Sequence, residues 1–356
     1  MAKSPQLTLL VTLKDRAGFT ERLYQYFKNI NYPFPVIFAD GSLGDEHEIF
    51  FANAAQQDFD FSYVRFPPDL TFKDYYKKCF ESLTLIKTPY VMVVDNDDFP
   101  IGEGQQEALS FLEKNADYVG CNGRVPGFSL SPDSHQPFGK HILCMNYYSA
   151  SMDVAVPLDQ EEPVERIKAY LKDFYSIYYS IFRTESVLKT FQQIYKLNFS
   201  DLGIVELFFS YHQLAQGKIH TIDSTTYMRQ QGSSQSASSQ KGWFDRLFYT
   251  NWLKDLKHCI DQVALESHTH ENKSLEWVKE SLYKDFTQRF KRRFIQNDWY
   301  FLKNPHLFFN IKTLKLIALL KIFRVSPWLG EKISYVLLER NLKQAFRLVS
   351  TFVSKV

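Results

Sequence analysis

Residues 90–100, YVMVVDNDDFP, join an apolar strand to a cluster of acidic residues. The run VMVV is typical of a strand that is buried on both faces of a sheet. Asp95, Asp97 and Asp98 follow it directly. Carboxylates that are crowded at the end of a core strand repel one another and resist removal from water. The stretch therefore predicts a buried strand whose charged end needs a compensating partner.

Strands and helices alternate around this stretch over about the first 120 residues. Strands at 6–13, 35–42 and 60–66 are predicted before the quoted one, with helices at 18–29, 71–86 and 104–115. This alternation predicts an α/β fold with a mostly parallel central sheet and helices on both faces. Ligands of such sheets bind beyond the carboxyl ends of the strands, which is where Asp40 and the three acids fall.

The rest of the chain is less regular and becomes helical. We expect a strand at 174–182, a helix at 185–196, a helix from 202 that Gly217 stops, and a short strand at 218–223. The expected organisation is an α/β domain over 1–230, a Ser/Gln-rich loop or linker over 231–242, and a basic, mostly helical domain over 243–356. Residues 281–356 contain fifteen Lys and Arg but four Asp and Glu, so the positive charge gathers there.

A divalent cation would offset the repulsion within the acidic stretch. Mg²⁺ and Mn²⁺ prefer oxygen ligands, often one or two carboxylates together with substrate phosphates. Asp95 and Asp97 are the candidate ligands, and a cation held there would neutralise a diphosphate leaving group. The alternative is a solvated turn in which Asp98 caps the segment that follows.

Four motifs follow one another along residues 6–230. They are VTLKDR (11–16), FADGS (38–42), TPYVMVVDNDDF (88–99) and DLGIVELFFSYHQLAQGK (201–218). In this order and spacing they resemble the GT-A glycosyltransferases, in particular a bacterial subgroup of the large inverting family with an N-terminal nucleotide-sugar domain. The resemblance implies an inverting enzyme that uses Mn²⁺ or Mg²⁺ and moves a sugar from a nucleotide-sugar donor to a hydroxyl acceptor. The implied acceptor is a glycan or lipid-linked saccharide of a bacterial surface polysaccharide.

The resemblance also implies roles for the residues at the strand ends. Asp40 would hydrogen-bond the nucleotide base. Asp95 would lie near the ribose and the water shell of the metal, and Asp97 would ligate the metal. Thr12 and Arg16 would line the nucleotide pocket.

Four further residues are assigned to the donor site. Asn96, between two of the acids, is placed with the nucleotide sugar. Lys78 is a candidate phosphate contact, and the alternative is a solvated helix face. Arg229 is a candidate diphosphate contact, and the alternative is an incidental arginine in an exposed linker. His220 is a candidate third metal ligand, as a histidine is in some enzymes of this fold, and the alternative is a structural histidine.

Glu206 is the candidate general base, because the resemblance places an acidic residue in the helix near the acceptor. An acceptor hydroxyl is a poor nucleophile until a carboxylate takes its proton. This chain departs from the family pattern, since the usual pair of adjacent acids before that helix is absent. Asp201 is therefore the alternative base, and an ordinary amphipathic-helix position is the alternative role for Glu206.

Two other functions remain open at this point. A nucleotidyltransferase should carry a Gly-rich, basic phosphate loop early in the chain, whereas LKDRAGF has a single glycine. A non-catalytic glycan-binding or scaffold protein would need no acidic cluster. Nucleic acid is not an expected partner, because basic residues do not interleave with aromatic residues in a known module pattern.

The four cysteines are widely spaced, which favours reduced thiols in a cytoplasmic protein. No run reaches the roughly 20 apolar residues that a bilayer crossing needs. The basic C-terminal helices are expected to contact the inner face of a membrane, to dock on the acidic body of the protein, or to form a homodimer.

Overall fold

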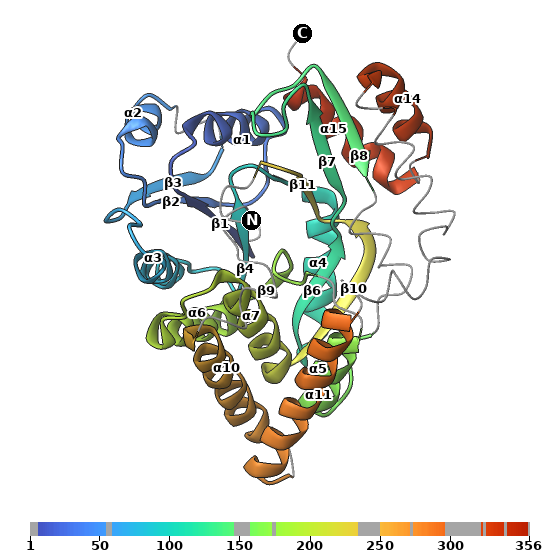
Figure 1. Ribbon diagram of the computed structural model, residues 1–356. Helices are drawn as coiled ribbons and strands as arrows, with labels where there is room; N and C mark the ends of the chain where they lie inside the picture. Colours follow the sequence, from blue (N-terminus) through green and yellow to red (C-terminus); the bar gives the residue numbers. More distant parts are fainter. Residues whose placement is uncertain are drawn as a thin grey trace.

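A seven-stranded, mostly parallel sheet forms the centre of the molecule in the computed structural model (Figure 1). The structure describes residues 6–54, 59–145, 157–172, 176–233, 250–270, 273–295, 322, 325–337 and 340–354. From edge to edge the strands are β10 (Lys218–Thr225), β6 (Tyr118–Arg124), β9 (Ile181–Arg183), β4 (Tyr90–Asp95), β1 (Leu7–Leu13), β2 (Val36–Asp40) and β3 (Phe61–Arg65). β9 runs antiparallel to both of its neighbours, and the other neighbouring pairs are parallel. The predicted α/β fold with a mostly parallel sheet is confirmed.

A second, four-stranded sheet extends from the end of β4. Its order is β5 (Phe99–Pro100), β11 (Tyr227–Gln230), β7 (Gly127–Ser131) and β8 (His141–Met145). β5 follows the acidic stretch directly, and β11 pairs with it in antiparallel register. This pairing brings residues from beyond position 226 to the carboxyl end of β4.

Two apolar cores lie on the two faces of the central sheet. In β1, Leu9 and Val11 belong to one core and Leu10 to the other, and in β4 Met92 and Val93 divide in the same way. The division follows from the period of two along a strand, which turns successive side chains to opposite faces. A strand that is covered on both faces must be apolar throughout, which explains the unbroken apolar run in β4.

Helices cover both faces of the sheet. The helices before residue 220 are α1 (Ala17–Asn29), α2 (Glu46–Ala52), α3 (Phe72–Thr84), α4 (Gly102–Lys114), α5 (Pro163–Lys172), α6 (Thr184–Leu197) and α7 (Leu202–Gln216). Those after it are α10 (Thr250–His268), α11 (Leu275–Ile295), α14 (Pro327–Leu337) and α15 (Arg340–Val353). Residues of α1, α4 and α15 join the first core, and residues of α3, α6, α7, α10 and α11 join the second. No described helix combines the length and the hydropathy that a bilayer crossing would require.

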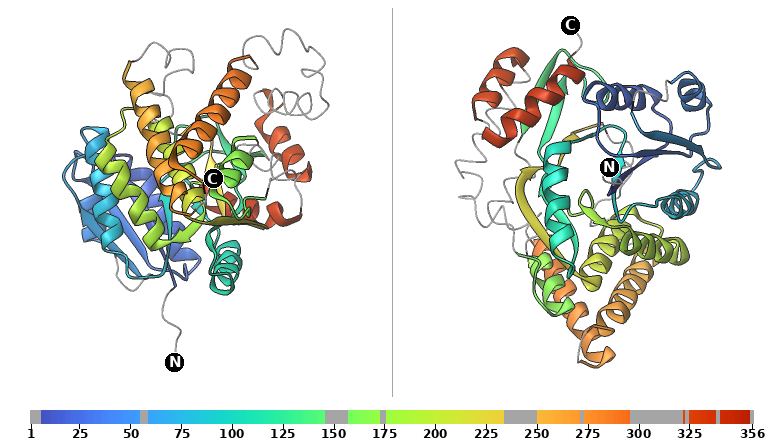
Figure 2. Two further views of the ribbon diagram at one scale, coloured as in Figure 1. Left: turned by 90° about the horizontal axis from the view of Figure 1, so that it is seen from below. Right: turned by 180° about the vertical axis from the view of Figure 1, so that it is seen from behind.

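The described C-terminal helices share these two cores with the first 230 residues. α10 packs on α7, and α11 packs on α5 and α10, at the end of the molecule opposite to α14 and α15 (Figure 2). α15 packs on α1, and its apolar face is buried. That face consists of Leu342, Phe346, Val349 and Val353, each at most 4% exposed. Docking on the body of the protein is therefore the observed arrangement for α15.

Two local predictions differ from the structure. The predicted strand at 174–182 is wrong over 176–180, where the chain forms a turn, and is confirmed only at its end, where β9 begins at Ile181; residues 174–175 lie outside the described residues. In the turn, Tyr178 packs against Phe209, and Tyr179 stacks on Tyr227 of β11. The helix α2 was not predicted, although Asp45 and the acids of its first turn favour a helix start. The four cysteines are buried and are not joined in disulfides.

Gly104 allows α4 to approach β10 closely, and this contact yields a first prediction. A Cβ atom at Gly104 would lie 2.0 Å from the backbone oxygen of Thr225, whereas one at Gly102 would make only ordinary contacts, 3.7 Å from the nearest atom. We expect Gly104→Ala to lower the free energy of unfolding by about 1–3 kcal/mol through overpacking. Gly102→Ala, in the same helical turn, should leave it unchanged or raise it by about 0.5 kcal/mol. Chemical denaturation followed by circular dichroism measures both, and equal effects would contradict the prediction.

Candidate functional site

A cleft of about 650 Å³ opens at the carboxyl ends of β1 and β4. Its lining comes from the end of β1 and the loop after it, from α3 and the two residues before it, from the end of β4 and the loop after it, and from the start of α7. The lining residues are Thr12, Leu13, Lys14, Asp15, Arg16, Leu70, Thr71, Phe72, Tyr75, Lys78, Asp95, Asn96, Asp97 and Leu202. The cleft therefore occupies the place where open α/β sheets bind their ligands.

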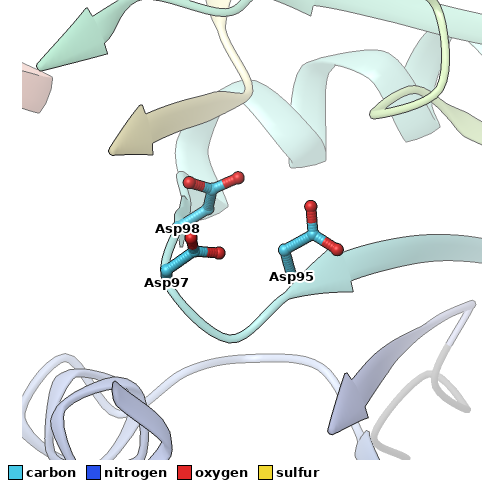
Figure 3. Close-up of side chains that lie close together, drawn as sticks. All are labelled: Asp95, Asp97 and Asp98. Carbon is cyan, nitrogen blue, oxygen red and sulfur yellow. The ribbon is translucent and has the colours of Figure 1, made fainter. Parts of the chain in front are cut away.

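Asp95, Asp97 and Asp98, called the acid cluster below, converge beside this cleft (Figure 3). Each offers a carboxylate oxygen, and the three oxygens lie within 4.8 Å of one another. Asp95 ends β4, opposite Thr12 in the register of β1, while the other two lie in the turn that follows. The turn folds back toward the strand, so that the three carboxylates gather in one region.

Each acid has a partner from a different part of the chain. Asp97 Oδ2 accepts hydrogen bonds from Arg16 Nη2 at 3.1 Å and from Ser233 Oγ at 2.6 Å. Asp95 Oδ2 accepts one from the hydroxyl group of Tyr179 at 2.8 Å. The cluster is thus held by residues that are up to 136 positions away in sequence, with Ser233 coming from the segment after β11.

Asp98 is the most deeply buried of the three acids. Its Oδ1 accepts from the backbone N–H of Gln230 at 2.8 Å, and Arg229 Nε lies 3.5 Å from Oδ2. The Arg229 guanidinium also lies over the Tyr179 ring, at 4.6 Å from its centre. Arg229 is therefore a partner of the cluster in β11, and the alternative interpretation of an exposed linker is wrong.

The electrostatics of the cluster fit a cation. Burial raises the pKa of Asp95 and of Asp98, and the charge of Asp97 raises both further, against the opposing effect of Arg229. Asp98 Oδ2 is buried and has no hydrogen-bond partner among the described residues. Three carboxylates that each offer a hard oxygen are a donor set that Mg²⁺ or Mn²⁺ accepts.

Arg22 supports the turn that carries the acids, and sequence analysis did not identify it. Its fully buried guanidinium donates to the backbone oxygen of Asp97 at 2.6 Å and to Gln230 Oε1 at 2.6 Å. Burial lowers the pKa of Arg22 to about 9, against the raising effect of Asp97 and Asp98. An arginine in an amphipathic helix resembles a solvent-facing residue, so the sequence carried no signal for this role.

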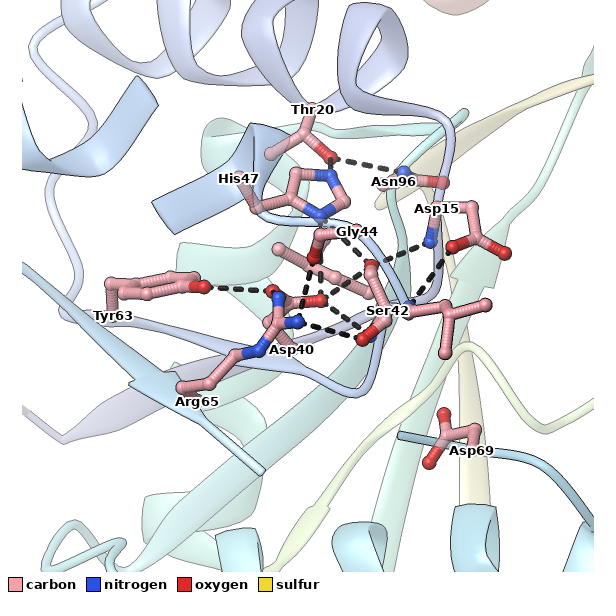
Figure 4. A network of polar contacts seen from close by, with 12 residues as sticks. Asp15, Thr20, Asp40, Ser42, Gly44, His47, Tyr63, Arg65, Asp69 and Asn96 are labelled. Carbon is pink, nitrogen blue, oxygen red and sulfur yellow. Dashed lines mark hydrogen bonds and ion pairs between the residues drawn. The ribbon is translucent and has the colours of Figure 1, made fainter. Parts of the chain in front are cut away.

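Asp40 lies in a buried network behind the cleft (Figure 4). Its Oδ1 accepts from both the N–H and the hydroxyl group of Ser42, at 2.8 and 2.5 Å, and its Oδ2 accepts from Tyr63 and Arg65. His47 Nδ1 lies 3.3 Å from Oδ1. Contact with a nucleotide base stays a prediction for Asp40, and it would require breaking one of these bonds.

The same network reaches the loop of the acid cluster. Ser42 Oγ contacts His47 Nδ1 at 3.0 Å, and His47 Nε2 contacts Thr20 Oγ1 at 2.9 Å. Asn96 Nδ2 then donates to Thr20 Oγ1 at 3.0 Å. Asn96 is 5% exposed, so its side chain is committed to this network while its position borders the cleft.

Lys78 lies at the cleft, where its phosphate contact stays a prediction, whereas His220 lies away from the acid cluster. Lys78 borders the cleft but is 2% exposed, so the alternative of a solvated helix face is wrong. Its Nζ forms a buried ion pair with Asp69 and donates to the backbone oxygen of Leu13 at 2.6 Å. His220 stacks on Phe111, with ring centres 4.0 Å apart, and the structure does not bring it to the acid cluster.

The two candidate bases differ in their surroundings. Asp201 caps the N-terminus of α7, where its Oδ1 accepts from the N–H of Ile204 at 3.2 Å. Glu206 lies one turn further along α7 and accepts from Ser176 Oγ at 3.3 Å. Between them, Leu202 lines the cleft, so the start of α7 forms one wall of it.

No protein-family model matches the chain, and no curated protein matches it. Solved structures of S. aureus TarS are similar to it in fold. TarS 1–349 in complex with UDP-GlcNAc has 14% identity and a TM-score of 0.51, over 80% of this chain and 73% of that one. TarS 1–349 has 12% identity and a TM-score of 0.50, over 98% and 88% of the two chains.

A longer TarS chain has 13% identity and a TM-score of 0.50, and the match spans 43% of its length. Identities this low show the fold alone. The likeness, together with the sheet described above, shows a mixed α/β fold of the GT-A-like Rossmann type with a helical part.

The Asp40 network yields a prediction about pH. Burial alone would raise the pKa of Asp40, but hydrogen bonds from His47, Ser42 and Tyr63 lower it well below its usual value. A lowered folded pKa stabilises the protein above the ordinary aspartate pKa of about 3.9, and this contribution disappears as the pH falls further. We expect Asp40→Asn to cost about 3 kcal/mol of stability near pH 7 and less below about pH 3.

Asp223→Asn is the matched control for this change, because the Asp223 side chain is 72% exposed and pairs with Arg124 at the surface. It should cost less than about 1 kcal/mol at either pH. Urea unfolding at the two pH values measures both variants. Equal losses for the two variants near pH 7 would contradict the importance of the network.

Proposed function

We propose that this chain is a metal-dependent, inverting glycosyltransferase that moves a sugar from a nucleotide-sugar donor to a hydroxyl acceptor. The observation that carries the proposal is the acid cluster at the edge of a cleft built from parallel strand ends. The similarity in fold to TarS, which has been solved with UDP-GlcNAc and with UDP, supports a nucleotide sugar as the donor. UDP-GlcNAc is therefore the first donor to test.

The acid cluster would hold Mn²⁺ or Mg²⁺ through carboxylate oxygens of Asp95, Asp97 and Asp98. A divalent cation at this position neutralises the negative charge of a departing nucleoside diphosphate. Arg229 lies behind Asp98 and offsets part of the charge of the cluster. Asp95 would also contact the ribose, and its position in the cleft beside Thr12 supports this role.

The nucleoside would occupy the part of the cleft between the loop after β1 and the start of α3. Leu13, Leu70, Phe72 and Tyr75 give this part an apolar lining. Leu70 and Phe72 are 74% and 41% exposed, so they offer apolar surface to a ligand in the cleft. A planar base packed between them would remove this apolar surface from water.

Glu206 is the proposed general base that takes the proton of the acceptor hydroxyl. The carboxylate of Asp201 caps the N-terminus of α7, where its Oδ1 accepts a hydrogen bond from the N–H of Ile204, so this oxygen already has a partner in the helix. Glu206 accepts a hydrogen bond from Ser176 Oγ at 3.3 Å. Its negative charge also raises the pKa of the neighbouring Tyr178, which burial raises most. Tyr178 hydrogen-bonds Tyr75, which lines the cleft, so Glu206 lies near the cleft lining.

The proposed acceptor is a glycan or a lipid-linked saccharide, which the protein would meet on the cytoplasmic side of a membrane. The buried apolar face of α15 cannot insert into lipid, so membrane contact would rest on cations such as Lys343 and Arg347. The apolar segment 311–325 falls almost entirely outside the described residues. A homodimer remains the other proposed use of the C-terminal helices.

Removal of the central carboxylate tests the donor site. Asp97→Asn should abolish the Mn²⁺-dependent part of UDP binding, a loss of at least about tenfold in affinity, because a neutral amide oxygen is a poor ligand for a hard cation. Calorimetry with UDP, with and without Mn²⁺, measures it. Asp223→Asn, a surface acid, is the control and should bind like the wild type. Metal-dependent binding that survives in Asp97→Asn would contradict the proposed ligand.

The general base is tested by a pair of isosteric changes. Glu206→Gln should keep UDP-GlcNAc binding but slow the Mn²⁺-dependent release of UDP by about 100-fold or more, since proton removal is lost. Asp201→Asn should slow that release by less than about tenfold. Product release is measured by chromatography across a panel of nucleotide sugars. A normal rate in Glu206→Gln would transfer the role to Asp201.

A further inference from the structure

Arg16 holds one oxygen of the acid cluster in a way that competes with a metal. Its Nη2 lies 3.1 Å from Asp97 Oδ2, and Ser233 Oγ donates to that same oxygen from 2.6 Å. An oxygen that already accepts two hydrogen bonds has spent its lone pairs and is a poor metal ligand. The Arg16 guanidinium thus supplies positive charge to the cluster in place of a cation.

Arg16 is placed to leave this oxygen again. Its side chain is 19% exposed and lines the cleft, and its guanidinium lies over the Phe19 ring, 4.1 Å from the ring centre. Arg22, in contrast, is fully buried and is fixed by bonds to Asp97, Gln230 and Pro137. One arginine therefore supports the acid cluster permanently, while the other contacts it from the solvent side.

The backbone under Arg16 is firmly anchored. Asp15 and Arg16 have φ angles of 54° and 63°, a left-handed conformation that costs about 1–2 kcal/mol per residue. The N–H of Asp15 donates to Ser42 Oγ at 2.6 Å, which ties this loop to the end of β2. The Arg16 side chain can thus change partner by rotating its own bonds while the loop stays in place.

We propose that Arg16 is an exchangeable counter-ion that couples cation binding to nucleotide binding. It neutralises Asp97 while the cleft is empty, and it moves to the diphosphate when a cation and a donor bind together. A guanidinium suits this exchange because its planar fork matches carboxylate and phosphate oxygens equally well. A cation alone must displace Arg16 without offering it a new partner, whereas a cation with a nucleotide supplies one. The inference rests on the proposed function, since it presumes a donor diphosphate in this cleft.

The first test measures Mn²⁺ binding without nucleotide, from the spectrum of free Mn²⁺ in electron paramagnetic resonance. Arg16→Ala should bind Mn²⁺ about three- to tenfold more tightly than the wild type, because a competing charged partner of Asp97 is gone. Lys14→Ala is the matched control. Lys14 carries the same charge and lines the same cleft, but its Nζ donates to the backbone oxygen of Asp69. Its removal should change Mn²⁺ affinity by less than about twofold.

The second test measures UDP binding by calorimetry in saturating Mn²⁺. Arg16→Ala should now bind about tenfold more weakly, because the diphosphate has lost its guanidinium partner. The two effects of one substitution therefore have opposite signs. A residue that only supports the fold or orients Asp97 would weaken both kinds of binding.

The outcomes separate this inference from the proposed function. Weaker or unchanged Mn²⁺ binding in Arg16→Ala overturns the exchange, and so does an equal tightening in Lys14→Ala. If either of these results is found and the wild type still binds UDP in a Mn²⁺-dependent way, the proposed function stands without the exchange. If the wild type binds no nucleoside diphosphate even in saturating Mn²⁺, both proposals fall.

Discussion

Three carboxylates that share a space 4.8 Å across at the end of β4 set the central constraint of this structure. Like charges so close together, and so deeply buried, cannot all stay ionised without positive charge or hydrogen-bond donors nearby. The chain supplies these from α1, from β11 and from the turn before β9. Arg22, Gln230 and Tyr179 are the clearest examples, and all are remote in sequence from the acids. The second sheet brings β11 to the acid cluster, so the position of this sheet helps to supply the donors and the positive charge that the carboxylates need.

The strand ends are linked to one another by side chains that have little freedom. Asp40 at the end of β2 and Asn96 after β4 belong to a single buried series of contacts through Ser42, His47 and Thr20. A satisfied buried network of this kind specifies one arrangement, because each partial rearrangement leaves a polar group unpaired. The cleft is therefore bordered on one side by Asn96, which this buried network holds in place. Arg16 and the exposed apolar residues near α3 border it on another side.

Sequence patterns predicted most of the fold but only part of the site. The apolar runs of β1 and β4 and the helical spacing of α1 and α3 are local properties, so they identified the central sheet and its cover. The grouping of Asp95 and Asp97 was also readable, because both belong to one strand end. Arg22 and Ser233 were not, since an arginine in an amphipathic helix and a serine in a Ser/Gln-rich stretch have no local feature that shows burial. Asp40 had the expected position, and its partner Ser42 belongs to the same motif. Its other partners, Tyr63, Arg65 and His47, come from β3 and α2, which the motif does not contain.

The contact between α15 and α1 has a consequence for how the protein is made. Tyr26 of α1 is fully buried, and its ring packs edge-on against Phe352 of α15 with centres 5.2 Å apart. The ribosome releases α1 more than 300 residues before α15, so translation leaves this apolar surface of the nascent chain uncovered until nearly all of the residues in between have been added. An exposed apolar surface on an incomplete chain makes that chain prone to aggregation and is the kind of surface that chaperones bind. The apolar face of α1 is thus fully covered only after α15 has been made.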